Sequence, residues 1–256
     1  MLADPRLRSE VTARLAAAGC VDPEGEADEL LAAATDRDQL DGWLSRREEG
    51  EPPAWITGTA VFCGRRLRVD PGVYVPRPQS EELARRAAAV LPSNGRALDL
   101  CCGSGALAAH LVAAVPSATV IAVDLDPRAI RCARSNGLAA IRGDLAEAVI
   151  EAPVFDVICA VAPYVPTDAV RFLPGDVQRH EPRLALDGGA DGLDPTRRIV
   201  DAAARRLRPG GWLLAELGAD QDDTLAPALA ADFEELTPWY DEDGDLRGLS
   251  ARRAPG

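Results

Sequence analysis

Lysine is absent from this chain of 256 residues, and aromatic residues make up only 4% of it. All 28 basic residues are therefore arginine, and 41 acidic residues leave a formal net charge of −13. A negative long-range field repels the phosphate backbone of nucleic acids. The composition thus disfavours nucleic acid as a partner.

Long apolar runs are also missing. No stretch of about eighteen uncharged apolar residues occurs, and residues 1–10 carry charges where a signal peptide is apolar. The six cysteines have no Cys-x-x-Cys spacing, which argues against a zinc site or a disulfide framework. We therefore expect a cytoplasmic protein with reduced thiols, no membrane contact and no metal.

The first 50 residues differ in composition from the rest. Residues 1–50 are rich in alanine, leucine, glutamate and arginine, with apolar residues at helical intervals, which predicts a small helical domain. Residues 51–80 place prolines and glycines around short β-favouring runs, which predicts a linker with a hairpin. After it, Ser80 is expected to cap a helix through Leu91.

Residues 81–256 show the alternation of an α/β domain. Strands are predicted at residues 97–100, 120–123, 140–142, 155–160 and 212–216, with two more at 233–236 and 247–251. Glycine turns and helical stretches separate the first five strands. This alternation predicts a Rossmann-like domain, with a mostly parallel sheet and helices on both faces.

A glycine-rich turn follows the first of these strands and opens a helix. Gly103 and Gly105 let the backbone approach a nucleotide-like ligand closely, and Asp99 and Cys101 belong to the same turn. About twenty residues beyond Gly103, Asp124 ends the next strand, where an acidic side chain accepts both ribose hydroxyls of a bound nucleoside. The sequence thus predicts a cofactor site at these strand ends.

A third acidic residue follows the next strand. Asp144 is placed to accept from an adenine amino group, and Leu145 to pack on the ring. The order of glycine turn, ribose acid and adenine acid separates a methyltransferase that uses S-adenosylmethionine from a simple nucleotide binder. Asp126 is expected to cap the helix that begins at Pro127.

Several blocks make the chain similar to a known family. They are residues 51–52, 57–58, 75–78, 99–105, 155–156, 162–164, 180–182 and 188–193. In order and spacing they resemble the protein-(glutamine-N5) methyltransferases, which modify peptide chain release factors. The resemblance implies a helical domain that grips the protein substrate, a hairpin linker and a seven-stranded catalytic domain that uses S-adenosyl-L-methionine. It also implies Arg77, in the Pro-Arg-Pro block, among the cofactor-binding residues.

The chain departs from this family at its catalytic tetrapeptide. The family has Asn-Pro-Pro-Tyr where this sequence reads Val161, Ala162, Pro163 and Tyr164. In the family, the Asn oxygen and a backbone carbonyl accept the two hydrogens of the substrate amide, whose nitrogen is a poor nucleophile. Val161 has no acceptor, and losing one such contact typically costs about 3 to 4 kcal/mol.

Three functions therefore remain open. The first is glutamine N5-methylation of a release factor, and the second is methylation of a small-molecule amine, hydroxyl or amide, for which Asp168, His180 or Glu181 would serve as a base. The third is a protein that binds the cofactor or a partner without catalysis. In the first two, Tyr164 is expected to form a wall against a planar acceptor group.

Overall fold

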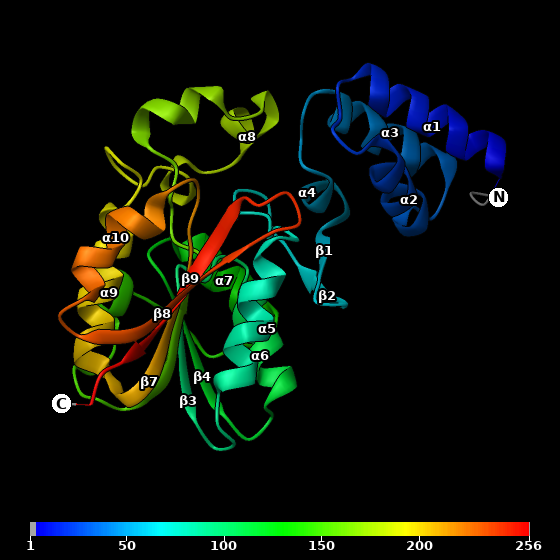
Figure 1. Ribbon diagram of the computed structural model, residues 1–256. Coiled ribbons are helices and arrows are strands. Elements are labelled where there is room, and N and C mark those ends of the chain that lie inside the picture. Colours follow the sequence, from blue (N-terminus) through cyan, green and yellow to red (C-terminus); the bar gives the residue numbers. More distant parts are fainter. Residues whose placement is uncertain (1–3, 256) are drawn as a thin grey trace.

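The computed structural model describes residues 4–255 (Figure 1). Its N-terminal part consists of three helices, α1 (Pro5–Ala17), α2 (Pro23–Ala33) and α3 (Arg37–Glu48). Each begins directly after an aspartate whose carboxylate accepts a backbone N–H of the first turn, namely Asp4, Asp22 and Asp36. The three capping aspartates therefore fix the residues at which α1, α2 and α3 begin.

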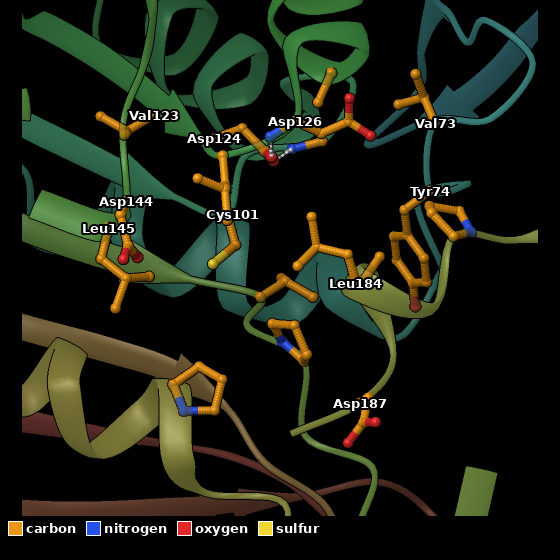
Figure 2. Close-up of a pocket in the computed structure, with 18 of the residues that line it drawn as sticks. Val73, Tyr74, Cys101, Val123, Asp124, Asp126, Asp144, Leu145, Leu184 and Asp187 are labelled. Atoms are coloured by element: carbon orange, nitrogen blue, oxygen red, sulfur yellow. Dashed lines mark hydrogen bonds between the residues drawn. The ribbon is translucent and has the colours of Figure 1, made fainter. Parts of the chain in front are cut away.

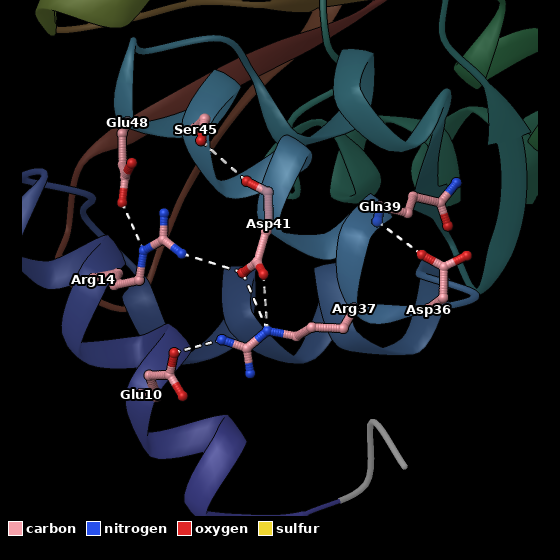
Figure 3. Close-up of polar contacts among 8 residues, drawn as sticks. All are labelled: Glu10, Arg14, Asp36, Arg37, Gln39, Asp41, Ser45 and Glu48. Atoms are coloured by element: carbon pink, nitrogen blue, oxygen red, sulfur yellow. Dashed lines mark hydrogen bonds and ion pairs between the residues drawn. The ribbon is translucent and has the colours of Figure 1, made fainter.

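Ion pairs join α1 to α3 on the outer side of this cluster (Figure 3). Arg14 donates to Glu48 over 2.8 Å and to Asp41 over 3.4 Å. Arg37 donates to Glu10 over 2.6 Å and also to Asp41. Because these side chains are largely in water, the buried leucines between the helices contribute most of the stabilisation.

A short linker leads from the helices to the main sheet. It contains α4 (Pro53–Thr57) and the antiparallel pair β1 (Thr59–Phe62) and β2 (Arg65–Arg68), which confirms the predicted hairpin. The Trp55 indole N–H donates to the carbonyl of Val73 over 2.9 Å, so the linker folds back on itself. It ends at α5 (Ser80–Val90).

The main sheet has seven strands in the order β5-β4-β3-β6-β7-β9-β8. They are β3 (Arg96–Leu100), β4 (Thr119–Asp124), β5 (Ala140–Arg142), β6 (Phe155–Ala160), β7 (Leu207–Glu216), β8 (Phe233–Tyr240) and β9 (Leu246–Arg253). The first five in the order run parallel, and β9 is antiparallel to both of its neighbours. The predicted seven-stranded, mostly parallel sheet is confirmed, and it gathers the carboxyl ends of five strands at one edge.

Helices cover both faces of this sheet (Figure 1). Their bounds are α6 (Ala106–Ala114), α7 (Pro127–Ser135), α9 (Asp194–Arg206) and α10 (Gln221–Leu229). Residues of α5, α6 and α7 share one apolar core with the sheet, and α9 and α10 share a second. In residues 4–255, no helix has both the length and the apolar character needed to cross a membrane.

Two strands, β7 and β8, are at least four residues longer than predicted. β7 begins at Leu207 rather than residue 212, because Leu207 already pairs with Phe155 of β6 and the Pro-Gly-Gly segment lies in a register irregularity before the next pair, Val157 with Trp212. β8 continues to Tyr240 rather than residue 236 and includes Pro238. As the edge strand, β8 needs backbone donors on one side only, so it accommodates proline.

A long connection, residues 161–193, follows β6 and carries η2 (Thr167–Phe172), α8 (Gly175–His180) and η3 (Arg183–Ala185). Figure 1 shows α8 above the sheet, on the side towards the N-terminal helices. Arg47 of α3 donates to Asp176 of α8 over 3.4 Å, and it is also paired with Glu26 of α2 over 2.6 Å. The connection thus reaches from the carboxyl edge of the sheet to the helical cluster.

Candidate cofactor and acceptor site

A cavity of about 170 Å³ opens at the carboxyl ends of β3, β4, β5 and β6 (Figure 2). Predicted site residues from all four strand ends line it, namely Cys101, Gly103, Asp124, Asp144, Leu145, Val161 and Pro163. Figure 2 shows Asp144 and Leu145 on one side of the cavity and Val73 and Tyr74 on the other. The fold therefore brings together residues that are up to 62 positions apart in the sequence, from Cys101 to Pro163.

Asp124, the last residue of β4, is held rigidly at the cavity wall. Its two carboxylate oxygens accept the backbone N–H groups of Gly103 and Asp126, each over 2.8 Å. Burial raises the pKa of Asp124, and these two hydrogen bonds act against that rise. Each oxygen keeps a lone pair beyond these bonds, which fits the predicted role of accepting two ribose hydroxyls. Asp126 caps α7 as predicted, accepting the N–H of Arg128 over 2.8 Å.

The loop after β3 turns sharply towards the cavity. Cys101 has φ +57° and Gly103 has φ +55°, both in the left-handed region. Burial, reinforced by the Asp124 carboxylate, strongly raises the pKa of the Cys101 thiol. The thiol therefore stays protonated and presents a small, neutral surface rather than a nucleophile.

Asp144 and Leu145 follow β5 as expected, but Asp144 has a partner that the sequence did not indicate. Arg198 of α9 donates to the Asp144 carboxylate over 2.9 Å and lines the same cavity. An adenine amino group would share this carboxylate with Arg198. The adenine-binding role of Asp144 and Leu145 stays a prediction.

The charge of the cavity suits a cationic ligand. Four aspartates line it, Asp124, Asp126, Asp144 and Asp187, against the single arginine Arg198. S-Adenosylmethionine carries a positive sulfonium and a positive ammonium group, which this wall attracts. The residues present therefore fit that cofactor in charge.

Two residues of the predicted turn lie behind the cavity. Asp99 is 1% exposed and accepts the N–H of Ala108 in α6 over 3.1 Å, and burial raises its pKa to about 7. Gly105 directly precedes α6 with φ +84° and packs against Leu138. Both shape the turn, and their contact with a cofactor stays a prediction.

Arg77 is likewise outside the lining of the cavity. Its guanidinium pairs with the buried carboxylate of Glu181, and it stacks over the ring of Tyr74 with 5.1 Å to the ring centre. Tyr74 itself lines the cavity, and burial raises its pKa to about 12. Arg77 thus supports the tyrosine wall, and its cofactor-binding role stays a prediction.

The segment after β6 places the divergent tetrapeptide at the cavity. Val161 and Pro163 line it, whereas Ala162 is buried at 3% exposure. The side-chain amide of Gln221 donates to the backbone carbonyl of Tyr164 over 2.9 Å and fixes the segment from the β7 side. The catalytic roles predicted for Val161 to Tyr164 stay predictions.

The glycines of the block at residues 188–192 have a packing reason. A Cβ on Gly188 would lie 2.6 Å from the carbonyl oxygen of Pro163, and one on Gly192 would lie 2.2 Å from that of Tyr164. Both approaches are too close for any side chain. The glycine turn therefore lets two backbone segments press together and holds the tetrapeptide in place.

Ser80 does not cap α5 as predicted. It is the first residue of the helix, after Gln79, and its hydroxyl donates to Glu216 over 2.5 Å instead. Glu216 ends β7 and is 2% exposed, and burial raises the pKa of its carboxyl group. Burial beside Glu216 also raises the pKa of Tyr164. Glu216 was not predicted, although it is an acid at a strand end like Asp124.

The three alternative bases lie away from the cavity. Asp168, His180 and Glu181 are not among the residues that line it. The His180 ring meets Trp55 edge-on, with 6.2 Å between ring centres, and its Nε2 is 3.5 Å from the carbonyl oxygen of Glu49. His180 therefore joins α8 to the linker.

Known proteins are similar to this chain in fold or in sequence. Residues 97–179 match a family model described as a methyltransferase domain. The crystal structure of a methyltransferase from Pyrococcus furiosus is similar with a TM-score of 0.54 and 18% identity, covering 74% of this chain and 89% of that one. This likeness shows the Rossmann-like fold, and the family model together with the relatives described next shows that the chain is an S-adenosylmethionine-dependent methyltransferase.

Proteins similar to this chain in sequence show which methyltransferase family it belongs to. The release factor glutamine methyltransferase of Geobacter sulfurreducens is 40% identical over 72% of this chain and 66% of that protein. The release factor glutamine methyltransferase of Moorella thermoacetica is 38% identical over 90% of this chain and 92% of that protein. The chain belongs to the release factor glutamine methyltransferase family. A 4-amino-L-phenylalanine/4-methylamino-L-phenylalanine methyltransferase of Streptomyces pristinaespiralis is also similar, 36% identical over 82% of this chain and 75% of that protein.

Proposed function

We propose that this protein methylates the side-chain nitrogen of a glutamine in a peptide chain release factor, in the cytoplasm. The observation that carries the proposal is that Val161 and Pro163 share one cavity with Asp124 and Gly103. Val161 and Pro163 belong to the segment expected to hold the substrate amide, and Asp124 and Gly103 to the strand ends expected to hold the methyl donor. The two expected binding regions thus share one cavity. The family to which the chain belongs supports the same substrate.

The chemistry rests on positioning. Bound S-adenosylmethionine supplies an electrophilic methyl group on its sulfonium. Asp124 holds the ribose, the backbone carbonyl of Ala162 accepts one hydrogen of the substrate amide, and Tyr74 closes the cavity against water. Fixing the two reactants at bonding distance supplies most of the acceleration, since the amide nitrogen is a weak nucleophile.

The N-terminal helices supply a surface for a protein substrate. Contacts of Arg47 with Asp176, and of His180 with Trp55 and the Glu49 carbonyl, tie the helical cluster and linker to the connection that forms part of the cavity wall. A loop of a release factor that enters the cavity would meet this surface at the same time. We therefore assign residues 1–50 to substrate recognition, residues 51–80 to the linker and residues 81–256 to catalysis.

Radiolabelled S-adenosylmethionine tests the proposal directly. The protein is mixed with a release factor that carries Gly-Gly-Gln and, as a matched control, with the same factor after Gln→Ala substitution. We expect label on the first factor and none on the second. An unlabelled first factor, under conditions in which a family member labels it, contradicts the proposal.

Val161 favours a second candidate, a methyltransferase for a free amine. A free amine is already nucleophilic, so it does not need the amide acceptor that valine lacks. The relative from Streptomyces pristinaespiralis, named for an aromatic amino compound, supports this alternative. Incubation with 4-amino-L-phenylalanine and mass spectrometry decides it, because a mass gain of one methyl group there without labelling of the release factor selects the amine.

A further inference from the structure

Tyr74 belongs to the walls of two cavities. The second cavity has a volume of about 30 Å³ and shares four lining residues with the first, namely Tyr74, Cys101, Gly103 and Val161. Figure 2 shows the Tyr74 ring across the first cavity from Asp144. Because one ring borders both spaces, its position sets the shape of the region in which a methyl donor and an acceptor would meet.

The backbone beside Tyr74 is fixed by a contact that does not involve its ring. The indole N–H of Trp55 donates to the carbonyl oxygen of Val73 over 2.9 Å, and Val73 lines the first cavity next to Tyr74. This hydrogen bond fixes where the linker passes the cavity, but it leaves the side-chain torsions of Tyr74 unconstrained. The orientation of the ring therefore depends on what packs against it.

Arg77 packs against this ring. Its guanidinium carbon lies 5.1 Å from the ring centre, within the range of a cation–π contact. Its positive charge also acts against the rise that burial causes in the pKa of Tyr74. Arg77 is not among the residues that line either cavity, so its route to a bound ligand leads through Tyr74.

Glu181 holds Arg77 from the opposite wall of the first cavity. The Glu181 side chain is 1% exposed, and its carboxylate is paired with the Arg77 guanidinium, which belongs to the linker 104 positions earlier in the sequence. Glu181 directly precedes Pro182, which lines the cavity together with Leu184 and Ala185. Breaking a buried pair leaves a charge unpaired away from water, so this ion pair ties the linker wall firmly to the connection wall.

We propose that Arg77 and Glu181 are positioning residues for methyl transfer, which act by holding the Tyr74 ring where the two cavities meet. This inference rests on the proposed function. Val161 offers the acceptor nitrogen no side-chain hydrogen bond, so the alignment of that nitrogen with the donor methyl group depends on the shape of the walls. Glu181 fixes the guanidinium, the guanidinium fixes the ring, and the ring confines the acceptor.

Arg77→Lys tests this role, because lysine keeps the positive charge beside Glu181 but lacks the planar group that stacks on the ring. We expect kcat to fall about tenfold, since a small displacement of a positioning wall has effects of this size. The Kd for S-adenosylmethionine should stay within about threefold, because the strand ends carry most of that binding. Arg85→Lys is the matched control, since Arg85 pairs with Glu81 and Glu82 on α5 and lines neither cavity. Its kcat should remain within about twofold of wild type.

Tyr74→Leu separates positioning from a general defect in folding, because it removes the ring through which the pair acts. By itself it should lower kcat at least about tenfold. Arg77→Lys and Glu181→Gln should lower the kcat of wild type about tenfold and about fivefold, but each should change the kcat of Tyr74→Leu by less than about twofold. Equal losses with and without the ring, or a fall of less than about threefold in Arg77→Lys, overturn the inference.

Two acceptors distinguish a failure of this inference from a failure of the proposed function. Each variant is assayed with the Gly-Gly-Gln release factor and with 4-amino-L-phenylalanine. A wild type that methylates only the amine overturns the release-factor proposal, and the same comparison with and without the ring, measured with the amine, then supports or overturns the positioning role. A wild type that methylates neither acceptor contradicts both proposals.

Discussion

Asp99 is an acid that is 1% exposed, beneath the turn that follows β3. Burial raises its pKa from 3.8 to about 7. Between these values the folded protein keeps the proton while the unfolded chain releases it. The free energy of unfolding therefore falls as the pH rises from about 4 to 7 and loses nothing further from this group above pH 7.

Asp99→Asn should remove this pH dependence. Asparagine cannot ionise and still offers an oxygen to the N–H of Ala108. We expect the variant to exceed wild type by about 4 kcal/mol in the free energy of unfolding at pH 8 and to equal it at pH 4. Urea unfolding at both pH values checks this, and an equal difference at the two would contradict it.

Gly105 shows what the element that carries the cofactor turn requires. It has φ +84°, and a Cβ there would lie 2.2 Å from Leu138 Cδ1. Gly137, between α7 and β5, has nearly the same φ of +82° but no atom within 4 Å of a Cβ. The two positions thus share the backbone strain and differ in crowding.

Alanine substitution at Gly105 and Gly137 should separate the cost of a positive φ from the cost of crowding. Gly137→Ala should cost about 1 kcal/mol in the free energy of unfolding, from the left-handed backbone alone. Gly105→Ala should cost about 3 kcal/mol, because the start of α6 must also move away from α7. Urea unfolding of both variants measures this, and equal losses would show that Leu138 yields without cost.

The order of elements follows from local patterns, whereas much of the site does not. Glycines, acids at strand ends and apolar runs identified the loop after β3, Asp124 and the parallel strands, because each signal lies within a few residues. The start of β7 and the length of β8 depended on pairing with distant strands. Ser80 donates to Glu216, 136 residues away, a contact that no local capping pattern contains.

Arg198 and Asp187 illustrate the same limit at the cavity. Both line it, but they come from α9 and the connection after β6, and only the folded arrangement brings them to the cavity that Asp124 also lines. In contrast, Glu216 had a usable local signal, since it ends a predicted strand as Asp124 does. Only the folded structure shows that the Glu216 carboxylate faces the Ser80 hydroxyl.

At the scale of the whole molecule, Asp176 joins the N-terminal helices to the connection after β6. Its carboxylate accepts from Arg47, which is 6% exposed, over 3.4 Å. Asp176→Asn should raise the KM for a release factor about fivefold and leave the Kd for S-adenosylmethionine within about twofold, because the contact lies outside the cofactor cavity. Steady-state kinetics and calorimetry measure the two constants.

Asp223→Asn is the matched control for that prediction. Asp223 is an exposed acid on α10, so its variant loses the same charge without loosening the helical cluster. An equal rise in KM in both variants would attribute the effect to net charge. An unchanged KM in Asp176→Asn would separate the N-terminal helices from substrate recognition.

The structure of the protein with S-adenosylhomocysteine, the product left by methyl transfer, tests the central claim most directly. The claim is that the ends of β3, β4 and β5 form one adenosyl site. We predict both ribose hydroxyls within about 3 Å of the Asp124 carboxylate and the adenine against Leu145. A ligand bound elsewhere, or one whose ribose does not reach Asp124, would contradict the account.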